Sequence, residues 1–266
     1  MIELQTQERH IAAELFRDYP FLQGYVASAL SGGMGTVSVD DPRRPTVAHI
    51  VLAWANILAG DPGSGPGDAM LKRILPNTTI VGQNARWVDA FYGLWGHRLE
   101  KWNKIYFSTG DWNLEKLTAS VHRIGDGYSI KQVKSIEDVG VLSLMGDGLV
   151  DFRNYLSPED FLNRGVGFIV ERHGESVSGC ASYAVGGGKY EISVSTKREH
   201  QGCGLAKAVA SRMILYCLSH GIEPCWDAPY GVGGILGAKL GFTNPKCYTA
   251  YRVLKVREYW NSTSWM

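Results

Sequence analysis

Hydrophobic positions in the C-terminal half of the chain fall into short runs separated by glycine turns, and into longer apolar stretches. The short runs have the length of strands, and the glycines at 174 and at 186–188 are typical of antiparallel hairpins. Residues 204–220 are apolar on most sides, which predicts a helix in the centre of a domain. The predicted elements of this half are, in chain order, a strand at 128–133, helices at 135–144 and 157–162, strands at 167–172, 176–185 and 189–196, a helix at 204–220, a strand at 223–226, a helix at 232–240 and a β region at 241–254.

The N-terminal half also mixes the two periodicities. Its predicted elements are a helical region at 4–30 that Pro20 interrupts, strands at 35–40 and 47–54, a loop at 61–68, a helix at 68–75, a strand at 78–81, a helix at 84–101 and a strand at 104–108. Trp87, Phe91 and Trp95 recur at helical spacing in the last helix. Such a stripe is more often part of a core than the wall of a ligand groove, and both interpretations are kept.

Strands and helices alternate through both halves, which predicts an α/β fold with a mixed sheet. A chain of 266 residues is longer than one average domain. We therefore expect an N-terminal α/β domain at 1–120 and a second domain at 121–266. No internal repeat is apparent in the sequence.

Composition and charge argue against several classes of protein. The chain carries 27 basic and 26 acidic side chains, so it lacks the basic excess typical of proteins that bind nucleic acids or membrane surfaces. No uncharged apolar stretch reaches the ~18 to 20 residues that span a bilayer. The five cysteines include no C-x-x-C pair, which argues against a metal site and a disulfide framework. We expect a cytoplasmic protein with no metal, nucleic-acid or membrane partner.

The segment most informative about chemistry joins the strand at 189–196 to the apolar helix at 204–220. Gly202 and Gly204 stand beside the helix start, where they allow a ligand to approach the backbone closely. Free amides and the positive end of the helix dipole suit a phosphate group at this point. A plain turn between strand and helix is the alternative. The dinucleotide, Walker and nucleophile-elbow patterns do not occur here.

These residues resemble a known family. Gln201-x-x-Gly204-x-Ala206 is similar to the pyrophosphate motif of the GNAT N-acyltransferase superfamily, and Lys239-Leu-Gly-Phe242 resembles the string that closes a late helix in those enzymes. The likeness covers residues ~125 to 255 by element order. The segments 217–222 and 223–228, with the turn at 39–42, look closer still to the branch that includes the zwittermicin A self-resistance acetyltransferase.

The resemblance implies a C-terminal GNAT domain that binds acetyl-CoA, and it implies roles for individual residues. Glu191 would be the base, with an exposed strand carboxylate as the alternative, and the amide of Val194 would stabilise the oxyanion. The position of the family's tyrosine acid is Gly237 here, and Tyr230, or Asp227 through water, would substitute for it unless these side chains are structural. The expected cofactor-binding residues are Val194, Ser195, Thr196, Gln201, Gly202, Cys203, Gly204, Leu205, Ala206 and Lys207. An acyl-cysteine at Cys203 is the covalent alternative to direct attack by an amine.

The implied activity is transfer of an acetyl group to a primary amine of a small molecule, which would be antibiotic-like in the branch named above. A non-catalytic acyl-CoA sensor, favoured by the missing tyrosine, and a protein N-acetyltransferase are the two alternatives. The N-terminal domain would shape the substrate side, or form a degenerate GNAT-like half without the pyrophosphate motif. We expect a monomer or a homodimer.

Overall fold

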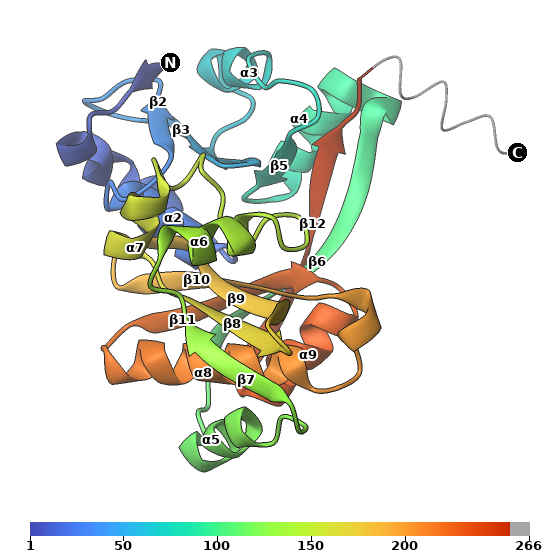
Figure 1. Cartoon of the computed structure of the whole chain (residues 1–266). Coiled ribbons are helices and arrows are strands. Elements are labelled where there is room, and N and C mark those ends of the chain that lie inside the picture. The colour runs from blue at the N-terminus through green and yellow to red at the C-terminus, as the bar shows by residue number, and fades with distance from the viewer. Residues whose placement is uncertain (256–266) are drawn as a thin grey trace, which may run out of the picture.

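Strands from both halves of the chain form one mixed sheet in the computed structural model, which describes residues 1–255 (Figure 1). The strands are β1 (Ile2–Glu3), β2 (Thr36–Val39), β3 (Val47–Leu52), β4 (Ala55–Gly60), β5 (Thr79–Gly82), β6 (Leu99–Gly110), β7 (Tyr128–Gln132), β8 (Gly167–Arg172), β9 (Glu175–Gly186), β10 (Lys189–Thr196), β11 (Glu223–Pro229) and β12 (Phe242–Val253). The α-helices are α1 (Ala13–Phe16), α2 (Gln23–Leu30), α3 (Gly65–Leu71), α4 (Ala85–Trp95), α5 (Leu114–His122), α6 (Ile136–Ser143), α7 (Pro158–Arg164), α8 (Leu205–Ser219) and α9 (Val232–Leu240), and 3-10 turns lie at Thr6–Ala12, Gly96–Arg98 and Arg198–His200.

The order of strands across the sheet is symmetric about its centre. It runs β1-β2-β3-β4-β5-β12-β6-β11-β10-β9-β8-β7, so each strand of the first six has a counterpart six numbers later. The pairing repeats too, because β3 and β4 are antiparallel like β9 and β10, and β4 and β5 are parallel like β10 and β11. The two halves therefore share one topology, although no repeat is apparent in the sequence.

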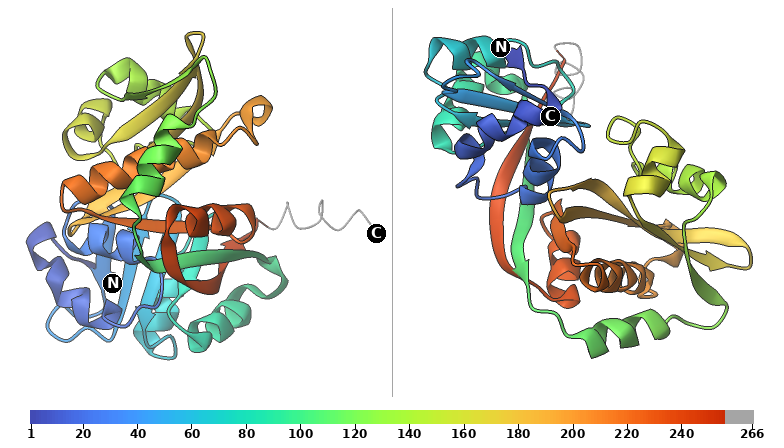
Figure 2. Two further views of the ribbon diagram at one scale, coloured as in Figure 1. Left: turned by 90° about the horizontal axis from the view of Figure 1, so that it is seen from below. Right: turned by 90° about the vertical axis from the view of Figure 1, so that its left-hand side faces the viewer.

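The last strand of each half lies in the sheet of the other half. β6 pairs with β11, β12 pairs with β5, and the two long strands pair with each other from Leu99 to Gly110. Figure 2 shows these strands running between the two lobes of the molecule. The N-terminal half thus supplies a strand to the immediate neighbourhood of β11.

Helices cover both faces of the C-terminal part of the sheet. In Figure 1, α8 and α9 lie below the strands, whereas α2, α6 and α7 lie above them. The lower layer is an apolar core formed by α8, β8 and β11, with Met213, Val170 and Trp226 all buried. The upper layer brings α2, from the N-terminal half, onto β9 and β10.

The predicted α/β fold class with a mixed sheet is confirmed. The strands expected at 167–172 and 189–196 are β8 and β10 with identical ends. The helix starts expected before α7 and α8 are also found, with Ser157 accepting the amide hydrogen of Asp160 and with Gly204 as the N-terminal cap of α8. Trp87, Phe91 and Trp95 are buried, so the core interpretation of that stripe is the right one.

Three local predictions are wrong for identifiable reasons. The helix expected over 84–101 ends at Trp95, because Gly96 turns away with a φ of 52° and β6 then begins. The strand expected over 47–54 ends at Leu52 and, through the turn at Ala53 and Trp54, is followed by the unpredicted strand β4. The loop expected over 61–68 already contains the first turn of α3, which Ser64 caps.

The domain boundary between 120 and 121 stays a prediction. β6 precedes that boundary, yet it lies between β12 and β11 in the sheet. The end of the second range, 256–266, lies outside the described residues. Within residues 1–255, no helix is both long enough and apolar enough to cross a membrane.

Candidate active site

Strands β10 and β11 separate and leave a slot between them. They pair only over Lys189–Glu191, after which β11 pairs with β6 instead. The amide of Lys197 donates to the Val177 carbonyl at 2.9 Å, so the alternation of the antiparallel ladder leaves the backbone groups of Val194 and Thr196 facing the slot. The slot therefore begins at Glu191 and is lined by main-chain groups of β10 that make no hydrogen bond to a neighbouring described strand.

The N-terminus of α8 forms an open cradle of amides at the wide end of this slot. Gly202 and Gly204 have φ angles of 80° and 79°, and no heavy atom lies within 4 Å of where a Cβ would stand on either. Among the described residues, the amides of 202–207 make no hydrogen bond. Unpaired amides and the positive end of the helix dipole together suit a phosphate group.

The other expected cofactor residues lie around the same loop. The side chain of Gln201 donates from Nε2 to the Thr196 carbonyl at 3.2 Å and so connects the loop to the end of β10. Cys203 is exposed, with its Sγ 3.8 Å from the Gln201 carbonyl oxygen. Lys207 is half-buried in the first turn of α8, and the Ser195 carbonyl accepts from Ser178 Oγ at 2.9 Å.

Glu191 lies at the closed end of the slot and is fully buried. Neither carboxyl oxygen has a hydrogen-bond partner of normal geometry among the described residues. Burial first, and the negative charge of Asp227 second, raise the pKa of Glu191 well above its usual range, against a smaller opposing effect of Lys104. Such surroundings favour the neutral, protonated form of a carboxyl group.

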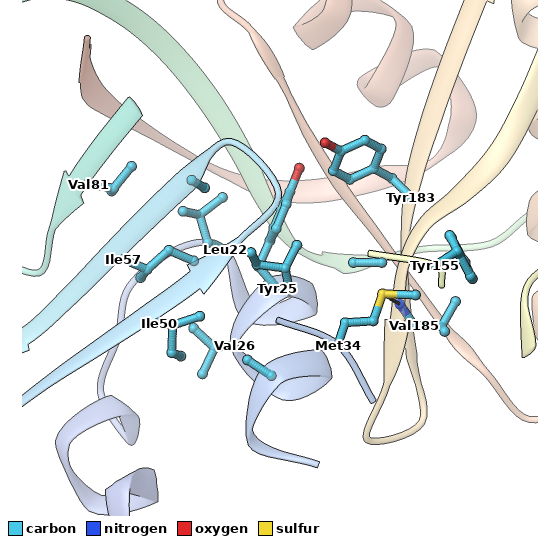
Figure 3. Packing of buried hydrophobic residues seen from close by; sticks show 14 of the residues in the cluster. Leu22, Tyr25, Val26, Met34, Ile50, Ile57, Val81, Tyr155, Tyr183 and Val185 are labelled. Carbon is cyan, nitrogen blue, oxygen red and sulfur yellow. Dashed lines mark hydrogen bonds between the residues drawn. The ribbon is translucent and has the colours of Figure 1, made fainter. Parts of the chain in front are cut away.

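Glu191 is covered by a helix of the N-terminal half. A Cβ added to Gly24 of α2 would come within 2.5 Å of Glu191 Oε2, so only glycine allows this close approach. The next residue, Tyr25, lies between Trp54 and Tyr183, with ring centroids 6.3 Å and 6.1 Å away. Figure 3 shows the hydroxyl ends of Tyr25 and Tyr183 side by side, where α2 meets β9.

A second buried carboxylate, Asp227 of β11, is fully paired. It forms an ion pair with Lys104 of β6 and accepts a hydrogen bond from the Tyr248 hydroxyl of β12 at 2.7 Å. The Lys104 ammonium also lies 4.9 Å from the ring centroid of Trp54. The two exchanged strands therefore deliver both partners of Asp227, and sequence reasoning missed them because they lie 123 and 21 residues away.

Lys104 and Tyr248 also line a pocket of about 360 Å³ on the protein surface. The remaining lining residues are Asn103, Tyr230, Cys247 and Thr249. Tyr230, the expected acid, is exposed at this pocket, and its amide donates to the Asn103 carbonyl at 3.0 Å. Glu191 pairs with Cys225, and Tyr230 follows Cys225 by five residues, a distance of about 16 Å along an extended strand. The structure therefore does not bring Tyr230 and Glu191 together.

The departure from the family pattern at Gly237 has a steric reason. A Cβ at this position would lie 2.9 Å from Phe107 and 3.0 Å from the Trp226 ring. The indole of Trp226 donates to the Gly233 carbonyl at 3.0 Å and holds α9 against β11. A tyrosine at residue 237 would displace Trp226, so any acid must come from elsewhere in the fold.

Comparisons with known proteins agree with this geometry. The sequence profile of the family described as GNAT acetyltransferase matches residues 14–251. A Bacillus subtilis (strain 168) protein named uncharacterized N-acetyltransferase YdfB is 38% identical over 97 residues, which is 36% of this chain and 37% of that protein. The aligned segment thus spans little more than a third of that relative.

Solved structures resemble almost the whole chain. A GCN5-related N-acetyltransferase-like protein from Streptococcus suis 89/1591 has a TM-score of 0.81 at 28% identity, over 92% of this chain and 98% of that one. A tandem GNAT protein from the clavulanic acid biosynthesis pathway has the same fold, with a TM-score of 0.58 at 13% identity over 94% and 96% of the two chains.

Proposed function

Because this chain belongs to the GNAT acetyltransferase family, we propose that it transfers the acetyl group of acetyl-CoA to a primary amine of a small molecule. The observation that carries the proposal is the amide cradle at Gly202–Lys207, which stands at the wide end of the slot between β10 and β11. The finer assignment to the branch of the zwittermicin A self-resistance acetyltransferase rests on the sequence resemblance alone.

The residues present fit acetyl-CoA. The free amides of 202–207 would hold its pyrophosphate, and the backbone groups of Val194 and Thr196 would pair with its extended arm. When bound, acetyl-CoA supplies an activated thioester carbonyl. The amide of Val194 faces the slot and would stabilise negative charge on the carbonyl oxygen, a contribution worth ~10² to 10³ in rate.

Glu191 is the proposed proton donor of the site, a change from the base that the resemblance implies. Its carboxyl is buried without a hydrogen-bond partner among the described residues, and burial favours the protonated form of such a group. A neutral acid at the closed end of the slot is suited to protonating the sulfur that leaves. Paired carboxyls whose surroundings differ commonly divide acid and base roles in this way. Tyr230 keeps a proposed role at the acceptor pocket.

The N-terminal half is proposed to be a degenerate GNAT-like half that completes the acceptor side. The repeated strand order supports a shared topology, and the likeness to a tandem GNAT protein supports the same arrangement of fold. Lys104 and α2 reach the buried carboxylates from this half, and Trp54 lies against the Lys104 ammonium. The small hydroxyl- and amide-lined pocket suits a polar small-molecule amine, in a protein we expect in the cytoplasm.

Two measurements test the proposal. Acetyl-CoA at about 100 times its dissociation constant should raise the free energy of unfolding by ~2.7 kcal/mol in a thermal-shift assay. Thiol release is then followed with spermidine, glucosamine and kanamycin, and separately with peptides that carry lysine. The absence of a thermal shift would refute the proposal, a shift without thiol release would favour an acyl-CoA sensor, and turnover of peptides alone would indicate a protein acetyltransferase.

A further inference from the structure

We propose that Tyr128, Arg172 and His200 hold the loop of the amide cradle in place and so set the affinity for acetyl-CoA. We refer to these three side chains as the loop anchor. They are positioning residues, because they act on the ligand through the loop. This inference rests on the proposed function, and the sequence resemblance gives none of the three a role.

The loop between β10 and α8 is poorly restrained at the cradle itself. Gly202 and Gly204 have positive φ angles, and open space surrounds the position of a Cβ on each of them. Packing therefore does not limit these two residues, and glycine has more backbone freedom than any other residue. A ligand that binds such a loop must also overcome the entropy cost of ordering it, unless contacts on either side order it beforehand.

The two sides of the cradle are held in different ways. On the α8 side, Leu205 is buried in the apolar core below the sheet. On the β10 side stands the 3-10 turn Arg198–His200, whose first two residues are exposed. Lys197, just before the turn, pairs with Glu175 at 2.7 Å, but their side chains are 39% and 60% exposed, and such an ion pair contributes little. A firm hold on this side must therefore come from the end of the turn.

His200, the last residue of the turn, makes the contact that holds this side. Its Nδ1 and the Tyr128 hydroxyl oxygen form a hydrogen bond of 3.0 Å, and the two rings meet edge to face with centroids 5.9 Å apart. Both side chains are half-buried. Tyr128 belongs to β7, three strands away from β10 in the sheet, whereas Gln201 is bonded to Thr196 at the end of β10 itself. Bonds to two separate strands fix both the position and the orientation of the loop.

Arg172 completes the loop anchor by holding Tyr128. It stands directly opposite Tyr128 in the β7–β8 ladder, with its Cζ 5.0 Å from the tyrosine ring centroid. Its Nη1 donates to the Tyr128 hydroxyl oxygen at 3.4 Å. Because that oxygen accepts from Arg172, the hydroxyl hydrogen is available to Nδ1 of a neutral imidazole. Arg172 therefore orients the Tyr128 hydroxyl toward His200.

Isothermal titration of Tyr128→Phe and His200→Ala with acetyl-CoA tests the loop anchor. Each variant should bind acetyl-CoA about 5-fold more weakly, the size expected for one hydrogen bond. The double variant should also lose about 5-fold, and not about 25-fold, because both changes break the same contact. His200→Asn should restore the affinity, since its amide group can take the place of Nδ1. With spermidine, glucosamine or kanamycin as the acceptor, KM for acetyl-CoA should rise while kcat stays the same.

Tyr216 and His220 provide the matched control, because they form a second tyrosine–histidine pair at the other end of α8, with ring centroids 4.0 Å apart. Tyr216→Phe and His220→Ala should leave the affinity for acetyl-CoA unchanged. Should His200→Ala fail to fold, Tyr128→Phe alone decides. Unchanged affinity in Tyr128→Phe, a loss confined to kcat, additive losses in the double variant, or an equal loss in Tyr216→Phe would overturn the loop anchor. A wild-type protein that does not bind acetyl-CoA would instead refute the proposed function itself.

Discussion

The two halves of the molecule share a strand order but differ at the helix that follows the central hairpin. At α8, the amides of 202–207 are unpaired and the space around Gly202 and Gly204 is open. At the counterpart α3, Ser64 Oγ accepts the Gly67 amide at 3.1 Å and Asp61 Oδ1 accepts the Gly63 amide at 3.0 Å. The same topology therefore offers amides to a ligand in one half and uses them internally in the other.

Two further differences make the tip of α3 unsuited to a phosphate group. Pro66 has no amide hydrogen, and the carboxylates of Asp61 and Asp68 stand at the helix tip, where a phosphate would meet like charge. β4 and β5 stay paired over four residues, and Gln83 extends their contact by donating to the Leu58 carbonyl. A GNAT-like topology thus becomes a phosphate cradle only where the loop leaves its amides free and the strands separate.

The largest expected effect compares a glycine at the tip of α8 with a glycine at the tip of α3. Gly204→Glu should weaken acetyl-CoA binding at least 100-fold, because a carboxylate fills the cradle, whereas Gly65→Glu at α3 should leave binding unchanged. Isothermal titration measures both. Gly174→Glu, at a hairpin turn with a φ of 81°, controls for backbone strain. Equal loss in Gly204→Glu and Gly65→Glu would remove the asymmetry between the halves.

In each half, the helix before the last strand packs on a neighbouring strand through a contact between a tryptophan and a glycine. The tryptophan is on the strand in one half and on the helix in the other. Trp226 of β11 faces Gly237 of α9, whereas Trp87 of α4 faces Gly82 of β5. We expect Gly82→Ala to lower the free energy of unfolding by about 3 kcal/mol, because its Cβ would lie 2.3 Å from Trp87, and Gly237→Ala by about 1 kcal/mol. Urea denaturation measures both changes.

Gly93→Ala is the control for this pair, because nothing lies within 4 Å of a Cβ at that helical position. It should raise the free energy of unfolding by about 0.5 kcal/mol. A loss in Gly82→Ala no larger than that in Gly237→Ala would contradict the ranking by contact distance.

The contributions of His49, in the N-terminal half, and Glu191, in the C-terminal half, to the free energy of unfolding should change with pH in opposite directions. Burial lowers the pKa of His49 to about 4, so the unfolded chain takes up a proton below pH 6.5 and the folded chain does not. His49→Gln should therefore gain stability over the wild type as the pH falls from 6.5 towards 4. The raised pKa of Glu191 acts the other way, so Glu191→Gln should gain stability as the pH rises above 4.5.

The difference in free energy of unfolding between each variant and the wild type should grow by at most about 1.4 kcal/mol per pH unit, the value for one proton. Urea unfolding at pH 4.5, 5.5, 6.5 and 7.5 measures them. A His49→Gln difference that is flat between pH 4.5 and 6.5 would show that the imidazole stays accessible to protons in the folded chain.

A small effect is expected at the cap of α3. Ser64→Ala should cost about 1 kcal/mol of stability, because the Gly67 amide loses its acceptor. Acetyl-CoA affinity should stay the same, since α3 has no part in the cradle. Chemical denaturation measures the loss of stability, and calorimetric titration measures acetyl-CoA affinity. A second acetyl-CoA site in Ser64→Ala would show that the Ser64 cap alone prevents binding at the tip of α3.

The amino-acid sequence by itself determined the α/β class, the positions of most helices and strands, and the amide cradle. These follow from local signals: the hairpin glycines around β9, the apolar faces of α8, and the motif from Gln201 to Ala206, whose chemistry lies within one loop. The spacing of the tryptophan stripe in α4 favoured a core position over a ligand groove, and its burial in the structure decided between the two.

Only the tertiary structure decided how the halves meet and which groups surround the carboxylates. Exchange of β6 and β12 joins strands more than 130 residues apart, and it brings Lys104 and Tyr248 to Asp227. The close cover over Glu191 depends on Gly24 of α2, far away in the sequence, which lets the helix approach the carboxyl group. Such contacts carry no local pattern, since pairing energy depends on neighbours in space and not on spacing along the chain.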